Sequence, residues 1–290
     1  MLFNSFDFAV FLPVVWVVYW LLAKRNLRLQ NGWIVIASYV FYGWWDWRFL
    51  SLLLLSSLLD FGVGCRLAGE THPLHRKLLL SLSLAGNLGL LGFFKYSNFF
   101  IDNFAAAFSL FGQSLQASTL NIILPVGISF YTFQTLSYTI DVYRRELKPT
   151  RDLIAFLAYV SFFPQLVAGP IERASNLLPQ FYRRREFNRS AATDGLRQIL
   201  WGLFKKMVVA DGCAVHVNAI FADPGAYPGS LRVLGALFFA FQIYGDFSGY
   251  SDIAIGTARL FGFQLMRNFA YPYFARDMAE FWRRWHISLS

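Results

Sequence analysis

The 290-residue chain is 56% hydrophobic and only 15% charged, and it contains 32 phenylalanines. About a quarter of the residues of a soluble domain are charged, so this composition argues against a water-soluble globular protein and indicates a helical membrane protein. The net charge of +9 comes from short loops between apolar runs, as the positive-inside rule describes. We therefore expect contact with the lipid bilayer and its anionic headgroups, and no nucleic-acid partner.

The first apolar run, Phe6–Ala23, is long enough to cross a bilayer and is followed by Lys24, Arg25 and Arg28. This order predicts an N-terminus outside and a first loop in the cytoplasm. Residues 98–111 are amphipathic and expected at the interface, and the uncharged loop 112–121 is expected outside. Further membrane segments are predicted from apolar runs at 33–45, 49–63, 78–94, 122–143, 153–170, 194–221, 231–244 and 253–263. The whole chain, residues 1–290, is read as a single domain with roughly seven to nine membrane segments.

Two of these runs are unlike plain anchor helices. Residues 122–143 contain a Pro125–Gly127 break, and residues 153–170 contain FFPQLVAGP between basic clusters on both sides. A simple crossing would place one cluster on the wrong side of the membrane. A re-entrant hairpin bent at Pro164 and Gly169–Pro170 fits, although helices lying flat on the membrane would give the same charge pattern.

Lysines interrupt the run at 194–221. Lys205 and Lys206 stand in its middle, and we expect the first half to lie along the cytoplasmic interface with these lysines reaching to the headgroups. The second half is expected to cross.

Asp246 and Asp252 stand in the apolar stretch YGDFSGYSD. Acids at membrane depth are costly, and they serve function or hold helices together. A spacing of six places them on different faces of an ideal helix, so we expect the glycines to break the helix here and let both acids, with Tyr250, line a substrate channel. The structural alternative is that each acid pairs with a nearby arginine or accepts backbone N–H bonds at a broken helix.

The final stretch, residues 275–290, reads as an amphipathic interfacial helix that brings Trp285 and His286 to the membrane. Imidazole is the commonest general base near neutral pH, although a single histidine beside tryptophan is more often a packing residue. Cys65 and Cys213 lie far apart, and no metal-binding cluster, P-loop or GxSxG motif occurs in the sequence. We expect no metal and no bound cofactor.

Three blocks, LPVGISFYTFQTLSYTIDVYR, FFPQLVAGPIER and YGDFSGYSDIAIG with NFAYPYFARDMAEFWRRWHISLS, resemble the membrane-bound O-acyltransferase family, alginate O-acetyltransferase type. The resemblance covers essentially the whole chain. It implies an all-α polytopic membrane protein, a ring of helices around a central funnel, in the bacterial inner membrane. It also implies that His286 has a supporting or channel role beside Trp285, and that the essential family histidine lies beyond Ser290, so that the chain is the N-terminal part of a longer one.

The resemblance implies transfer of an acetyl group from a cytoplasmic thioester, acetyl-CoA or an acyl carrier protein, to a hydroxyl of an exported polysaccharide such as alginate. It also implies a periplasmic partner that completes delivery. Two other functions remain open from the residues alone. One is a polysaccharide or glycolipid transporter, in which broken helices and intramembrane acids line the path. The other is a non-catalytic membrane subunit of an export complex.

Overall fold

The computed structural model describes residues 1–23, 25–110, 125, 127–166 and 169–289. These residues form helices and connecting loops, without a β-strand among them. The predicted outer loop 112–121 and the last residue of the chain fall outside the described residues. The all-α class of the prediction is confirmed.

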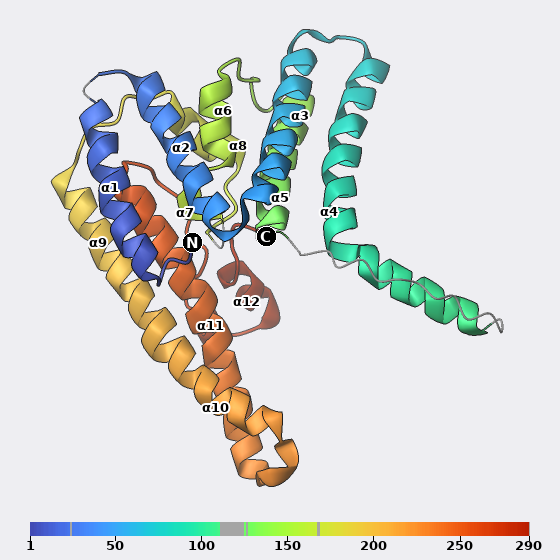
Figure 1. The fold of residues 1–290 in the computed structure, drawn as a ribbon, viewed down its shortest axis with the longest axis vertical. Coiled ribbons are helices and arrows are strands. Elements are labelled where there is room, and N and C mark those ends of the chain that lie inside the picture. Colours follow the sequence, from blue (N-terminus) through green and yellow to red (C-terminus); the bar gives the residue numbers. More distant parts are fainter. Residues whose placement is uncertain (24, 111–124, 126, 167–168, 290) are drawn as a thin grey trace.

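The N-terminal part is a set of long apolar helices (Figure 1). Helix α1 spans Phe6–Ala23, as predicted, and α2 spans Leu27–Asp46 after Asn26, whose side chain accepts a hydrogen bond from the Arg28 N–H. The short helix η1, Trp47–Phe49, turns the chain back into α3, Leu50–Gly69. Among the described residues, three helical stretches are long and apolar enough to cross a membrane, namely Phe6–Ala23, Leu27–Gly69 and Pro73–Ile101.

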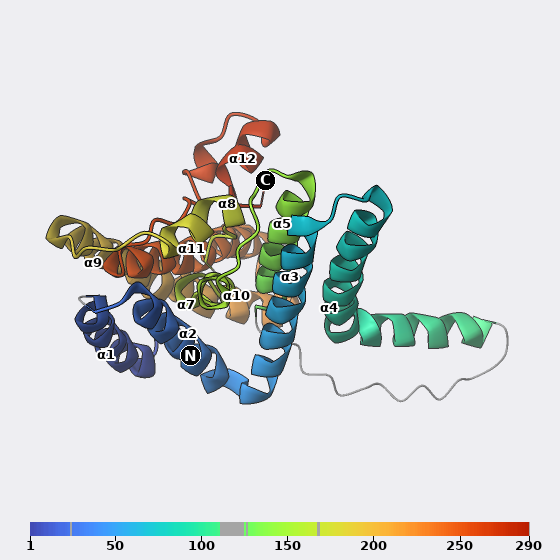
Figure 2. The ribbon, with the colours of Figure 1, turned by 90° about the horizontal axis from the view of Figure 1, so that it is seen from above.

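Helix α4 spans Pro73–Leu110 and includes most of the segment that we expected to be a separate amphipathic element. The expectation that the segment ends near residue 94 was wrong, because the helix continues to Leu110, but its ribbon bends sharply and its second part points away from α3 (Figures 1 and 2). The first part of α4 contacts α3 through buried polar groups. Asn87 donates to Asp60 over 2.8 Å, and Ser56 donates to Asn87. Hydrogen bonds of this kind hold helices together where the lipid offers no competing partner.

The Pro125–Gly127 break and the FFPQ segment meet in the core. Gly127 has a φ of +78° and precedes α5, Ile128–Arg144. A Cβ at this glycine would lie 2.5 Å from the Leu166 carbonyl oxygen, so both its backbone angle and its neighbour require glycine. Helices α6, Leu153–Val160, and α7, Phe163–Leu166, are separated by a break at residues 161–162, where both side chains are almost fully buried. The irregular backbone therefore lies inside the protein, as expected for such backbone at membrane depth.

The C-terminal part begins with the short helices α8, Ala174–Leu177, and η2, Leu178–Phe181. A long helical hairpin follows. Its first arm is α9, Arg189–Leu203, continued by the π-helix η3, Phe204–Ala210, and by α10, Asp211–Ala222. After the turn η4, Pro224–Ala226, its second arm is α11, Gly229–Leu260. The chain ends with η5, Pro272–Phe274, and α12, Met278–Arg284, on the opposite side of α11 from α1 (Figure 2).

Candidate active site

Glycines allow the two arms of the hairpin to approach closely. A Cβ on Gly256 would lie 2.5 Å from the Gly195 carbonyl oxygen, and a Cβ on Gly249 would lie 2.9 Å from that of Gly202. Small residues at such positions bring two helix backbones into direct contact. The glycines in and around YGDFSGYSD therefore serve close packing. The expected helix break was wrong, because α11 runs without interruption through both aspartates.

The two acids of α11 pair with the two lysines of η3. Lys205 forms an ion pair with Asp252, and the Lys206 Nζ lies 2.8 Å from an Asp246 carboxylate oxygen. The lysine side chains are only 12% and 14% exposed, so the expectation that they reach out to the headgroups was wrong. The structural alternative, in which each acid has a cationic partner, is the arrangement found, with lysine in place of arginine.

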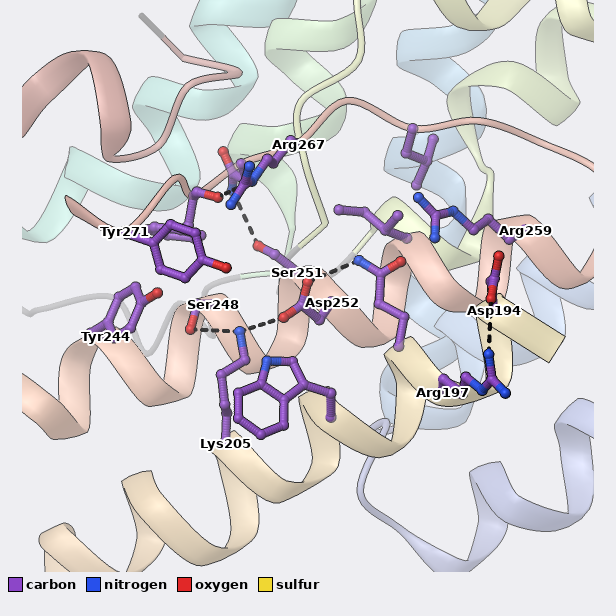
Figure 3. A pocket seen from close by; sticks show the side chains of 16 residues that line it. Asp194, Arg197, Lys205, Tyr244, Ser248, Ser251, Asp252, Arg259, Arg267 and Tyr271 are labelled. Atoms are coloured by element: carbon purple, nitrogen blue, oxygen red, sulfur yellow. Dashed lines mark hydrogen bonds and ion pairs between the residues drawn. The ribbon is translucent and has the colours of Figure 1, made fainter. Parts of the chain in front are cut away.

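A pocket of about 600 Å³ opens beside the Lys205–Asp252 pair (Figure 3). Lys205 lies between Ser248 and Asp252, and its Nζ is 3.0 Å from the Ser248 Oγ. The Gln198 amide donates to Asp252 over 2.9 Å. The charged side chains that line the pocket are four cations and two carboxylates, namely Arg197, Lys205, Arg259, Arg267, Asp194 and Asp252. The excess of cations favours an anionic or strongly polar ligand.

A loop after α11 forms the opposite wall of the pocket and leads to His286. The Asn268 amide donates to the Ser251 Oγ on α11 over 3.2 Å, and its carbonyl oxygen accepts from the Ser288 Oγ over 2.9 Å. The Ser288 Oγ also accepts the Ile171 N–H and lies 3.4 Å from the His286 Nδ1. Because the Ser288 proton is committed to Asn268, its oxygen acts as an acceptor toward the imidazole. This favours the tautomer with hydrogen on Nδ1 and leaves Nε2 free to accept a proton.

The surroundings of His286 suit a neutral imidazole. The ring lies edge to face with Phe247, at 4.8 Å between centroids, and the backbone is left-handed with a φ of +47°. Burial lowers the pKa of His286 below its ordinary value of 6.5, because a half-buried site disfavours the charged form. Burial therefore favours the neutral imidazole, which is the form that a general base needs.

The structure separates the residues that were expected to share one channel. Asp252 lines the pocket, whereas Asp246 and Tyr250 face Lys206, whose Nζ lies 5.5 Å from the Tyr250 ring centre. Trp285 packs edge to face on Phe269, which itself lines the pocket. The expected interfacial helix over 275–290 is reduced to α12, so His286 lies in an irregular segment after the helix.

Several pocket residues were not singled out from the sequence as site residues. They are Gln198, Lys205, Ser248, Ser251, Arg267 and Asn268. Lys205 carried a usable signal, since a lysine within an apolar run needs a partner. The buried Glu172 of the GPIER block was also missed, and its carboxylate accepts a hydrogen bond from the Met266 N–H and one of 2.6 Å from Asn176. This carboxylate fixes the start of the loop that carries Arg267 and Asn268.

The fold and the pocket define an all-α membrane protein with a polar, cation-rich cleft between long helices. A model of the membrane-bound O-acyltransferase family matches residues 144–290. Over the whole chain the sequence is 41% identical to the probable alginate O-acetylase AlgI of Pseudomonas putida, of which it covers 59%. It is 37% identical to the peptidoglycan O-acetyltransferase of Helicobacter pylori, of which it covers 60%.

A more distant relative is the teichoic acid D-alanyltransferase of Bacillus subtilis, which is 28% identical over 59% of this chain and 44% of its own length. The chain thus belongs to the membrane-bound O-acyltransferase family, and the predicted resemblance is confirmed. It spans less than two thirds of the length of these curated relatives.

Proposed function

We propose that the protein transfers an acetyl group from a thioester donor to a hydroxyl of an exported polysaccharide. In this reaction the hydroxyl oxygen attacks the thioester carbonyl carbon, the hydroxyl proton passes to a base, and the donor leaves as a free thiol. The donor would be acetyl-CoA or an acyl carrier protein on the cytoplasmic side of a bacterial inner membrane. Alginate is the proposed acceptor, by the name of the Pseudomonas putida relative described above, and a periplasmic partner would complete delivery.

One observation carries the proposal for this chain's own residues. A hydrogen-bonded path runs from Ser251 in the pocket through Asn268 and Ser288 to the His286 imidazole. It leaves the His286 Nε2 free to act as a proton acceptor or, after protonation, as a donor to the oxyanion of the tetrahedral intermediate. The family resemblance implies a further histidine for the central proton transfer, so His286 is proposed in a supporting or channel role, with Asp252 and Trp285 nearby.

The transporter alternative depended on a broken helix lined by acids. Helix α11 is continuous and both acids are paired with lysines, so the feature that favoured transport is not present in this part of the chain. The two functions also differ in chemistry. Acyl transfer releases free thiol, whereas transport leaves both the donor and the polymer chemically unchanged.

The test is thiol release and polymer acetylation by membranes that contain the complete protein. We expect both only when donor and acceptor are present together, and we expect His286→Ala to lower both while membrane insertion is retained. The matched control is His216→Ala, because His216 is exposed on α10 and its ring packs on Phe238. Thiol release without acceptor, or polymer movement without thiol release, would contradict acyl transfer. Equal activity of the two variants would remove His286 from the mechanism.

A further inference from the structure

A second hollow lies between the end of α1 and the basic segment after η2. Its volume is about 630 Å³. The walls are mostly apolar and aromatic, with charged groups at one end, and consist of Trp16, Val17, Trp20, Leu21, Ala23, Arg184, Arg185, Glu186 and Phe187. We refer to these nine residues as the α1 groove.

The aromatic wall of the α1 groove is held in place by the end of α11. Both Trp16 and Trp20 donate their indole N–H groups to the Leu260 carbonyl, at 3.0 and 3.1 Å. The Phe187 ring packs edge to face on both indoles, at 5.7 and 5.4 Å. Since the indole N–H groups are already bonded, these rings present apolar surface to whatever occupies the groove.

Arg185 adds a buried positive charge that has no carboxylate partner among the described residues. Its guanidinium lies over the rings of Tyr19, Phe181 and Phe263, at 5.7, 5.7 and 4.8 Å from their centres. The Arg185 side chain is 7% exposed, and its guanidinium donates to the neutral side chains of Gln30 and Asn31. Its Nη1 is buried without a hydrogen-bond partner. A buried charge is costly unless an opposite charge or hydrogen bonds complement it.

The surface of the groove adds a second cation. Arg184 is exposed beside Arg185, and Glu186 is the one acid in the groove lining. Two arginines against one glutamate leave an excess of one positive charge. The groove therefore joins an apolar, aromatic channel to a cationic end, at the terminus of a helix that is apolar enough to span a membrane.

We propose that the α1 groove binds one anionic phospholipid. An acyl chain would lie along Trp16, Trp20 and Leu21, and the headgroup phosphate would bind the exposed Arg184, with the buried positive charge of Arg185 behind it. Arginine suits this role because its planar guanidinium matches phosphate geometry. A lipid is favoured over a free anion because the greater part of the lining is apolar and α1 itself is a candidate membrane span.

The groove is joined to the element that carries the active-site pocket. Its aromatic wall is bonded to Leu260, and the adjacent Tyr19 hydroxyl donates to the Phe261 carbonyl over 2.7 Å. Both carbonyls belong to the end of α11, which bears Asp252 at the pocket. The proposal concerns binding and does not depend on the acyl-transfer function.

The test uses the detergent-purified protein and native mass spectrometry with added phosphatidylglycerol or phosphatidylcholine. We expect one retained phosphatidylglycerol, weaker retention of phosphatidylcholine, and about fivefold lower phosphatidylglycerol affinity in Arg184→Gln, since one cation at a headgroup contributes about 1 kcal/mol. The matched control is Arg183→Gln, because Arg183 is exposed and adjacent in sequence but does not line the groove.

Four results would overturn the proposal. Equal retention of the two lipids, or no retention of either, would mean that the groove does not select an anionic lipid. Equal loss of affinity in the two arginine variants would assign the effect to diffuse surface charge. Displacement of phosphatidylglycerol by millimolar inorganic phosphate would indicate a site for a free anion.

Discussion

Asp252→Asn should destabilise the protein by removing the charge that compensates Lys205. The two side chains are 12% and 22% exposed, which places the pair between an exposed ion pair, worth about 0–1 kcal/mol, and a buried one, whose disruption costs about 3–5 kcal/mol. Each side chain also has one hydrogen bond outside the pair, Lys205 to Ser248 and Asp252 from Gln198. We therefore expect a loss of about 2 kcal/mol.

The pairwise part of this loss can be measured with a double-mutant cycle. Lys205→Met alone strands the carboxylate, whereas Lys205→Met combined with Asp252→Asn removes both charges. We expect the double variant to be more stable than the sum of the single losses predicts, by about 1–2 kcal/mol.

The assay is thermal unfolding of the purified protein in detergent, in which 1 kcal/mol corresponds to about 2–4 °C. The control is Asp194→Asn, because the Arg197–Asp194 pair at the same pocket is 77% and 56% exposed and 3.5 Å apart. Its loss should stay within about 0.5 kcal/mol. If the stability losses of the Lys205 and Asp252 variants are strictly additive, or if the control shows an equal shift in melting temperature, the Lys205–Asp252 pair does not behave as a buried ion pair.

Two further predictions concern the packing of the hairpin and the titration of His286. Gly256→Ala should lower the free energy of unfolding by about 1–3 kcal/mol, because the new Cβ would meet a backbone oxygen at 2.5 Å. The control Gly62→Ala, whose Cβ meets nothing within 4 Å, should leave stability unchanged or higher. Similar losses in the two variants would contradict the close-packing role. The acidic limb of the pH–rate profile should lie below pH 6.5, since burial lowers the pKa of His286. Phe247→Ala should expose the His286 ring and move that limb toward 6.5. A limb that the variant does not move would show that another group titrates.

The sequence predicted the helical membrane class and the first span well, because both depend on local properties. An apolar run of the right length bounded by basic residues defines α1 without reference to any neighbour. Gly127 was also recognisable as a point where regular structure stops, since Pro125 stands two residues before it. Asn26 and Asp152 cap α2 and α6 with their side chains, as their residue types favour.

The interior of the hairpin was less predictable, because glycine has two opposite uses. It loosens a backbone, which suggested a break at YGDFSGYSD, and it also permits close approach of a second helix, which is its use on α11. The two possibilities differ only in what lies opposite, and that depends on how the arms dock. The pairing of Lys205 with Asp252 was hidden for the same reason.

The link from the pocket to His286 could not be predicted from periodicity. Asn268 and Ser288 lie in irregular segments and are brought together by a left-handed turn at His286. Side chains in such loops follow no repeating spacing, so their contacts appear only after the chain has folded around them.

The π-helical segment η3 determines how the two arms of the hairpin are aligned. A π-helix closes its hydrogen bonds over one residue more than an α-helix, so η3 behaves as a single-residue insertion accommodated within an otherwise regular arm. Removing one residue from it would rotate α10 by about 100° relative to α9. The docking of Gly202 on Gly249 would survive, but that of Ala210 on Gly245 would be lost. The length of seven residues in η3 thus sets the rotation of α10 relative to α9, and with it the residues of α10 that face α11.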